Sequence, residues 1–394
     1  MRSPGPKTSG LTCSPGLPER PGGLCINALE SLRQHTRVVA DTGDFLGIEA
    51  YRPDDATTNP SLILRAVQQQ AYRAILREAS AAAEAPTGVS TTPPGAGVAM
   101  AGRVDRLLVR FGMEILRLIP GRVSTEVDAR LSFDANATFG RAMGLAEHYA
   151  RMGVAAHRVL IKIAATWEGI EAAQRLEQRG VQCNLTLVFS LTQARACADA
   201  GVQLISPFVG RITDWFRQRE QREYAPHEDP GVESVRRIHR HFKQHGYRTE
   251  IMGASFRSPG QVLALAGCDL LTISPGLLGL LKTMEGPVER QLFSDGTTGH
   301  PVAARLPADP LGDGAANQPA EAPAGEPVEA PADEPVDARF APGARAQPRR
   351  ASAALSQAQF RWELNEDAMA TEKLAEGIRI FAADGLRLEQ LLAG

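Results

Sequence analysis

The chain has 394 residues, a formal net charge of −2 and a hydrophobic content of 43%. This length suits one large domain with additional segments, and the composition is ordinary for a globular protein. The balanced charge excludes a global basic field, so we expect no nucleic-acid or membrane partner. Because the sequence shows no apolar run long enough to span a bilayer and no signal-peptide centre near its start, we expect a cytoplasmic protein.

The five cysteines form no CxxC pair and have no nearby histidine at metal-ligand spacing. This pattern is typical of free thiols in a reducing compartment. We expect Cys183, Cys197 and Cys268 to pack in the core. The eight histidines show no HExxH pattern or ligand cluster, so we expect no metal site.

Composition divides the chain into four segments. Residues 1 to 26 are rich in Pro and Gly, and we expect a disordered extension. Residues 27 to 300 carry the patterns of a folded domain, interrupted by an irregular stretch at 84 to 101. Residues 301 to 355 hold 10 of the 27 prolines, so we expect a disordered insert that acts as a flexible tether. Residues 356 to 394 form a helical segment of the same domain.

Within the domain, short β-branched runs alternate with helical stretches, which is typical of βα units in a parallel sheet. Strands are predicted at residues 37 to 41, 55 to 59, 123 to 129, 158 to 164, 183 to 189, 202 to 208, 249 to 255 and 269 to 274. Helices are predicted at residues 61 to 83, 138 to 152, 168 to 179, 191 to 200, 231 to 246, 259 to 266 and 276 to 284.

About eight parallel units favour a closed (β/α)8 TIM barrel over an open doubly wound sheet. Neither GxGxxG nor GxxxxGK[ST] follows any predicted strand, which makes nucleotide binding a poor fit. In the last segment, apolar residues recur near the helical period: Leu374, Ile378, Phe381, Leu388 and Leu392. We expect this helical segment to pack back on the barrel.

One lysine stands inside an apolar strand. The run VLIKIA places Lys162 where an unpaired ammonium would be costly to desolvate. Burial favours the neutral amine, which is the form that attacks a ketone to give an iminium. Taken alone, the feature also fits a structural lysine that pairs with a barrel carboxylate or reaches solvent at the strand end.

Polar residues also stand at the ends of the neighbouring predicted strands. Because TIM-barrel active sites lie at the carboxyl ends of the strands, we expect Asp41 and Glu126 to project into the same space as Lys162. Two carboxylates beside an amine suit proton transfer in imine chemistry, and a buried charge network that stabilises the lysine is the alternative.

Two arginines and three amide or hydroxyl side chains accompany this group. Arg211 and Arg257 suit bidentate clamping of a phosphate, and a surface or helix-capping role is the alternative. The other three suit hydrogen bonds either to sugar hydroxyls or to buried backbone groups: Asn59, Asn184 and Ser206.

Ordered motifs along the chain resemble those of the transaldolases, within the class I Schiff-base aldolases, and particularly the long, dimeric bacterial kind. The motifs are VVADTGD, DATTNPSLI, PGRVSTEVDARLS, LIKIAATWEGI, CNLTLVFSLTQARACADAGV, LISPFVGRITDW, EDPGV and MGASFR. The resemblance runs from about Leu32 to Gln291 and from about Ser356 to Leu392. The N-terminal extension, the loop at 84 to 101 and the Pro-rich insert depart from the family pattern.

The resemblance implies a homodimeric transferase of the non-oxidative pentose phosphate pathway that needs no metal or organic cofactor. It would move a dihydroxyacetone unit reversibly from sedoheptulose 7-phosphate to glyceraldehyde 3-phosphate, giving erythrose 4-phosphate and fructose 6-phosphate. By motif, Lys162 corresponds to the Schiff-base lysine and Asp41 to the base that takes the C4 hydroxyl proton. Glu126 corresponds to the residue that moves protons during dehydration, through a water held by Thr186.

The resemblance also implies the substrate contacts. The residues that would hold the dihydroxyacetone hydroxyls are Asn59, Asn184 and Ser206. The phosphate site would consist of Arg211, Ser255 and Arg257. Phe208 stands where the related short fructose 6-phosphate aldolases tend to carry Tyr, which favours transfer over release of free dihydroxyacetone.

Two other functions stay open. A fructose 6-phosphate aldolase-like enzyme would form the same Schiff base and release dihydroxyacetone without an acceptor. A non-catalytic sugar-phosphate binding protein would keep the barrel and lose turnover, although the presence of Lys162, Asp41 and Glu126 argues against it.

Overall fold

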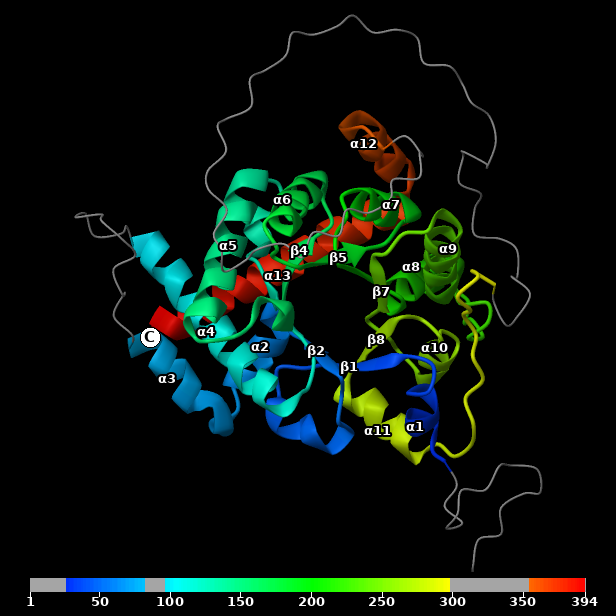
Figure 1. The fold of residues 1–394 in the computed structure, drawn as a ribbon, viewed down its shortest axis with the longest axis horizontal. Coiled ribbons are helices and arrows are strands. Elements are labelled where there is room, and N and C mark those ends of the chain that lie inside the picture. The colour runs from blue at the N-terminus through cyan, green and yellow to red at the C-terminus, as the bar shows by residue number, and fades with distance from the viewer. Residues whose placement is uncertain (1–25, 82–95, 298–353, 394) are drawn as a thin grey trace, which may run out of the picture.

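The computed structural model describes residues 26–81, 96–297 and 354–393, which contain a closed barrel of eight parallel strands (Figure 1). The strands are β1 (Arg37–Asp41), β2 (Asp55–Thr57), β3 (Val123–Glu126), β4 (Val159–Ala164), β5 (Cys183–Val188), β6 (Leu204–Pro207), β7 (Glu250–Gly253) and β8 (Leu270–Ile273). Each strand pairs with the next along the chain, and β8 closes the ring on β1. The predicted TIM barrel is confirmed, with strand ends within a few residues of the expected ones.

Helices surround this ring. They are α1 (Ala28–Leu32), α2 (Pro60–Val67), α3 (Arg73–Ala81), α4 (Ala96–Leu118), α5 (Ala135–Arg151), α6 (Trp167–Gln178), α7 (Leu191–Asp199), α8 (Gly210–Glu220), α9 (Pro230–His245), α10 (Pro259–Leu263) and α11 (Pro275–Thr283). The C-terminal pair is α12 (Gln357–Glu366) and α13 (Ala368–Ala393).

Three helical regions differ from the sequence predictions. The helix expected at 61 to 83 is divided into α2 and α3, because a 3-10 turn at Gln70–Tyr72 buries the Tyr72 ring against Phe45 and Phe111. Helix α4 starts at Ala96, inside the stretch expected to be irregular at 84 to 101. Helix α8 had no sequence prediction.

The barrel interior is layered, because alternate residues of each strand point inward. An apolar layer crosses the middle and consists of Val39, Leu160, Leu204, Met252 and Leu270. Below it, at the amino ends of the strands, Arg122 forms ion pairs with Asp55 and Glu250. The layer above it, at the carboxyl ends, is also polar.

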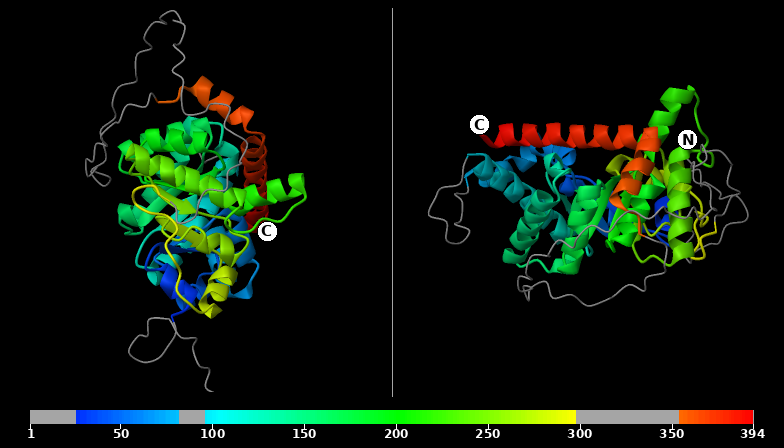
Figure 2. Two further views of the ribbon diagram at one scale, coloured as in Figure 1. Left: turned by 90° about the vertical axis from the view of Figure 1, so that its right-hand side faces the viewer. Right: turned by 90° about the horizontal axis from the view of Figure 1, so that it is seen from above.

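Helix α13 crosses the carboxyl end of the barrel. It passes behind the ring in Figure 1 and runs along one face of the molecule in the right-hand view of Figure 2. Its side chains bond to loops and helices that follow different strands, through Glu372 to Trp215, Asp384 to Ser61 and Glu389 to Arg130. The five apolar residues that predicted this segment are all buried, which confirms that it packs back on the barrel.

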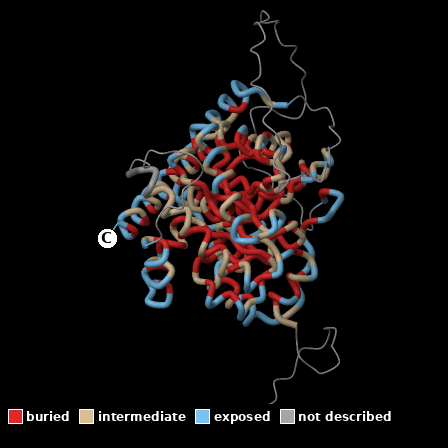
Figure 3. Tube along the Cα trace, turned by 60° about the vertical axis from the view of Figure 1, so that its left-hand side comes forward, coloured by how far each residue is buried: buried red, intermediate tan, exposed pale blue. Residues whose placement is uncertain are grey.

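Buried residues concentrate in the strands and on the inner faces of the helices (Figure 3). Cys183, Cys197 and Cys268 are buried free thiols, as predicted. Within the described residues, no helix has the length and apolar character needed to cross a bilayer. The segments predicted at 1 to 26 and 301 to 355 lie almost wholly outside the described residues.

Candidate active site

Strand register places three of the predicted residues side by side. Glu126 on β3 pairs with Lys162 on β4, and Lys162 pairs with Asn184 on β5. Neighbouring residues in a parallel sheet point to the same face, so all three side chains enter the barrel in one row. All three are buried, with exposed fractions of 4%, 4% and 0% respectively.

The amine of Lys162 has a small set of contacts. Its Nζ lies 3.2 Å from Glu126 Oε2 and donates to the Thr58 carbonyl over 3.3 Å. The ring of Phe381 lies on another side, with its centroid 6.0 Å from Nζ. A buried amine with a single carboxylate partner can pass its proton to that carboxylate and become a nucleophile.

Burial raises the pKa of Glu126 above its ordinary value, although the Lys162 charge and hydrogen bond oppose this rise. A raised carboxyl pKa favours the protonated acid at a pH where an exposed glutamate is ionised. The pair can therefore exist either as ammonium and carboxylate or as amine and acid. Proton exchange within the pair suits general acid–base catalysis.

Asp41 ends β1 at the same end of the barrel. Its Oδ1 accepts a hydrogen bond of 3.0 Å from the hydroxyl of Thr57, which lies 2.7 Å from the hydroxyl of Thr272. Burial raises the pKa of Asp41, while the Lys162 charge and the Thr57 hydrogen bond lower it by less. A raised pKa makes this carboxylate a stronger base than an exposed aspartate.

A buried polar chain extends from Asn184. Its Nδ2 donates to Ser124 Oγ over 3.0 Å, and its Oδ1 accepts from the Ser206 hydroxyl over 2.6 Å. Thr186 lies two residues further along β5, and its buried hydroxyl has no hydrogen-bond partner among the described residues. A free buried hydroxyl of this kind can bind a water or a substrate oxygen.

Arg211 and Arg257 lie at the rim of this end. Burial lowers the pKa of Arg211, and the charge of Arg257 lowers it further. Arg211 Nη1 is buried without a hydrogen-bond partner in the described part of the chain, whereas Arg257 donates to Asp214 Oδ2 over 3.0 and 2.8 Å. Two guanidinium groups that repel each other form a favourable place for an anion.

Ser255 shapes the backbone beside these arginines. Its φ of 62° lies in the left-handed region that non-glycine residues rarely adopt. Its carbonyl accepts from the Gly210 N–H over 2.9 Å and from Arg257 Nη1 over 3.1 Å, and its hydroxyl accepts from Arg257 over 3.2 Å. The strained turn therefore joins the start of α8 to Arg257.

Two phenylalanine rings cover Arg211. The guanidinium carbon lies 5.1 Å from the centroid of Phe208 and 5.5 Å from that of Phe381. Phe381 belongs to α13, which approaches closely because residue 377 is glycine. A Cβ at Gly377 would lie 2.6 Å from Leu187 Cδ2 and 3.3 Å from Arg211 Nη1.

Sequence reasoning did not assign Phe381 to the site. The helical period indicated that the residue would be buried, but no local pattern shows which barrel residues it covers. Asn59 lies beyond the end of β2, although the strand was expected to reach residue 59, and it takes one of the two roles left open for it: it caps α2, where its Oδ1 accepts from the Leu62 N–H over 2.9 Å. Its amide Nδ2 is the part left for a ligand.

The family model described as transaldolase/fructose-6-phosphate aldolase matches residues 38–309, which is more than half of the chain. The matched range contains strands β2 to β8 and all of β1 except Arg37. The chain therefore belongs to the transaldolase/fructose-6-phosphate aldolase family of Schiff-base enzymes.

Proposed function

We propose that the protein is a transaldolase that forms its Schiff base on Lys162. It transfers a dihydroxyacetone unit reversibly from sedoheptulose 7-phosphate to glyceraldehyde 3-phosphate. The observation that carries the proposal is the buried pair of Lys162 and Glu126, 3.2 Å apart, at the end of the barrel where Asp41 also lies. The same proposal places the protein in the pentose phosphate pathway and in the cytoplasm, as a homodimer. Light scattering tests the dimer.

In the first half of the reaction, Glu126 takes a proton from Lys162, so that Nζ can attack the C2 carbonyl of the ketose. The new C–N bond forms as the carbonyl π electrons move to oxygen, which takes up a proton. Nζ then gives up one of its two protons, and a second protonation of the oxygen releases it as water and leaves an iminium. Glu126 supplies and recovers these protons, with a water on the Thr186 hydroxyl as the relay.

In the second half, Asp41 accepts the proton of the C4 hydroxyl. The C3–C4 bond breaks, its electrons flow into the iminium, and an aldehyde leaves. The remaining enamine stays bound to Lys162, with its hydroxyls held by Ser206, Asn184 and the amide nitrogen of Asn59. Attack of the enamine on the acceptor aldehyde reverses these steps, and hydrolysis of the new iminium releases the product.

The phosphate of either sugar lies at the rim in this proposal. Arg211 and Arg257 provide the charge, and the Ser255 hydroxyl lies beside Arg257. Phe208 is buried next to Arg211 and carries no hydroxyl that could donate a proton to the enamine. This supports transfer to an acceptor rather than protonation and release.

The direct test is reduction with borohydride in the presence of fructose 6-phosphate. We expect a stable three-carbon or six-carbon adduct on the peptide that contains Lys162. Lys162→Met should yield no adduct, whereas Lys282→Met, which changes an exposed lysine on α11, should trap as the wild type does. An adduct on another lysine, or none, contradicts the proposal.

A second assay separates transfer from simple cleavage. Fructose 6-phosphate is supplied with and without erythrose 4-phosphate, and glyceraldehyde 3-phosphate is measured. We expect sustained turnover only with the acceptor, and we expect Phe208→Tyr to increase the acceptor-independent rate. Equal rates with and without the acceptor would identify a fructose 6-phosphate aldolase instead.

A further inference from the structure

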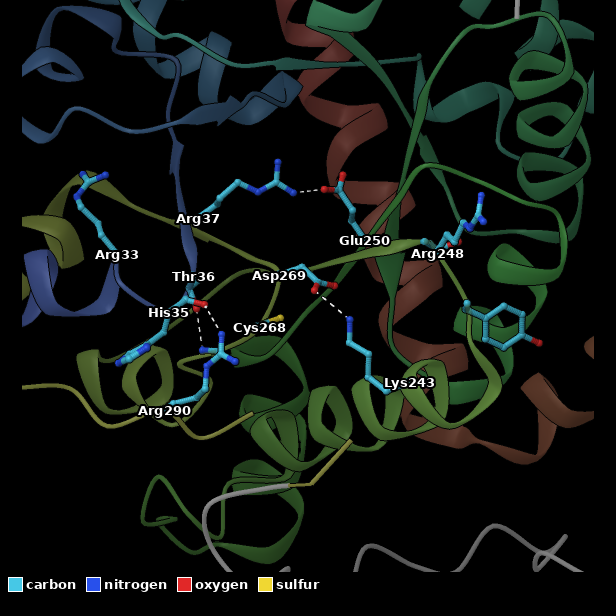
Figure 4. Close-up of a pocket in the computed structure, with 13 residues that line it drawn as sticks. Arg33, His35, Thr36, Arg37, Lys243, Arg248, Glu250, Cys268, Asp269 and Arg290 are labelled. Carbon is cyan, nitrogen blue, oxygen red and sulfur yellow. Dashed lines mark hydrogen bonds and ion pairs between the residues drawn. The ribbon is translucent and has the colours of Figure 1, made fainter. Parts of the chain in front are cut away.

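A second cavity lies at the opposite end of the barrel from Lys162. It has a volume of about 600 Å³ and is built around the starts of β1, β7 and β8 (Figure 4). Strand β1 has five residues, and at a rise of about 3.3 Å per residue its two terminal Cα atoms lie about 13 Å apart. The barrel core, including its apolar layer, therefore separates this cavity from the candidate active site.

The lining of the cavity is strongly cationic. Five basic side chains and two carboxylates line it: Arg33, Arg37, Lys243, Arg248, Arg290, Glu250 and Asp269. This excess of positive charge contrasts with the net charge of −2 of the whole chain. A concave surface with charge of one sign concentrates ligands of the opposite sign.

Each of the two carboxylates in the lining already has a cationic partner within the cavity. Arg37 forms an ion pair with Glu250, and Lys243 Nζ lies 3.1 Å from Asp269 Oδ1. Arg33 lies within 4 Å of carboxylates outside the cavity lining, at 3.7 Å from Glu30 and 3.8 Å from Asp54. These three cations are therefore balanced by the protein itself.

Arg248 and Arg290 are not balanced in this way. Among the described residues, Arg248 has no hydrogen-bond or ion-pair partner, and Arg290 donates only one long bond of 3.4 Å, to the His35 carbonyl. Favourable interaction with a helix C-terminus explains Arg33 and Lys243, at the ends of α1 and α9. It does not explain Arg248 or Arg290, because both lie outside helices.

We propose that this cavity binds a small molecule carrying a phosphate or diphosphate group, attracted by the exposed, unbalanced charges of Arg248 and Arg290 on opposite sides of its lining. Guanidinium groups bind phosphate oxygens through paired, charge-assisted hydrogen bonds. The volume lies within the range of about 300–1,000 Å³ of known ligand cavities, so the whole of a small phosphorylated compound fits. The site is separate from catalysis, and its ligand stabilises the folded barrel by mass action.

The test uses calorimetric titration of the full chain with inorganic pyrophosphate at low ionic strength. We expect two sites in the wild-type protein, one at each end of the barrel. Arg248→Gln with Arg290→Gln should weaken one site at least tenfold and leave sugar transfer unchanged. Arg257→Ala should weaken the other site and reduce sugar transfer.

Two further variants keep the outcome decisive. Arg151→Gln removes an exposed arginine of α5 outside the cavity and should leave both pyrophosphate sites intact. Arg248→Gln alone removes a side chain without partners among the described residues, so its fold should be unchanged and its binding weakened. If Arg257→Ala abolishes all binding, or if the double variant binds like the wild type, the second site does not exist. A failure of borohydride trapping would not affect this result.

Discussion

The two polar ends of the barrel shift the pKa of a glutamate in opposite directions. At the carboxyl end, burial raises the pKa of Glu126, and the single ammonium of Lys162 does not reverse this rise. At the amino end, burial also raises the pKa of Glu250, but the charge and hydrogen bonds of Arg122, the Gln203 hydrogen bond and the charge of Arg37 together lower it below its ordinary value.

The two glutamates differ in how many cations and hydrogen-bond donors surround them. Lys162 is the cation that most lowers the pKa of both Glu126 and Asp41, yet burial still leaves both pKa values raised. Glu250 receives ion pairs from two arginines. A barrel end with too little positive charge keeps its protons mobile, which suits catalysis, whereas a well-supplied end fixes its charges and stabilises the fold.

The largest expected contrast comes from replacing the central cation at each end. Lys162→Met should reduce sugar transfer by about four orders of magnitude or more, because the covalent intermediate can no longer form. Arg122→Met should reduce the free energy of unfolding by about 3–5 kcal/mol, because Asp55 and Glu250 lose the partly buried ion-pair partner that they share. Coupled assays and urea unfolding of both variants measure the two effects.

This contrast is broken if Arg122→Met folds as stably as the wild type, or if it loses transfer activity while remaining folded. The first result would show that the amino end tolerates unpaired acids. The second would connect that end to catalysis.

The glutamates should also differ in how pH changes their effect. Because its pKa is raised on folding, Glu126 stabilises the folded state at a pH below about 4.5, the ordinary pKa of a glutamate. This stabilisation is lost as the pH rises through the pKa of the folded state. A lowered pKa makes Glu250 contribute above about 4.5 and lose it as the pH falls through the folded pKa. At pH 7, Glu126→Gln should therefore be at least as stable as the wild type, and Glu250→Gln less stable by about 1–3 kcal/mol.

Urea unfolding at pH 7 and near pH 3 measures both trends. The destabilisation by Glu250→Gln should shrink at the lower pH. Activity should instead be lost mainly in Glu126→Gln, because this change removes a proton carrier and should lower kcat by about 10²–10⁴-fold. If both variants change stability in the same direction at pH 7, the comparison between the ends is wrong.

Arg257 tests the rim of the catalytic end. Arg257→Ala should raise the KM for phosphorylated sugars by about 10- to 100-fold, which corresponds to about 1.5–3 kcal/mol for a charge-assisted bond. Asp214→Asn is the matched control, because it frees Arg257 from its ion pair and should not raise this KM. An equal loss with unphosphorylated fructose would remove Arg257 from the phosphate site.

The smallest effect is expected from the ring on α13. Phe381→Leu should lower kcat about three- to tenfold, since a cation–π contact is worth about 0.5–2 kcal/mol. Phe360→Leu is the matched control, because it makes the same change at a buried ring that packs on Trp167. Equal activity of the two variants would show that Phe381 only fills space.

Local sequence patterns predicted much of this molecule. The β-branched runs predicted the strands. The register of the folded barrel then brings Glu126, Lys162 and Asn184 into one row. The shared phosphate site of Arg211 and Arg257 was implied by the family resemblance, and it stays a prediction. The fold itself could be predicted because the geometry of a closed barrel fixes which strand ends are adjacent.

Contacts across the molecule could not be predicted in this way. Phe381 reaches Lys162 because α13 crosses the barrel, and no periodicity encodes the angle of that crossing. Asn59 caps α2 because strand β2 ends at Thr57, two residues earlier than its sequence pattern predicted. Arg248 and Arg290 stand far apart in the sequence, so their shared cavity appears only once β1, β7 and β8 are assembled.

The position of α13 also sets an order of events during synthesis. The eight strands end at Ile273, so all of them are synthesised before α13 begins at Ala368. Phe381 can therefore cover the Lys162 amine and Arg211 only after the residues of every strand have been made. The last helix of the fold thus supplies one wall around the central amine of the barrel.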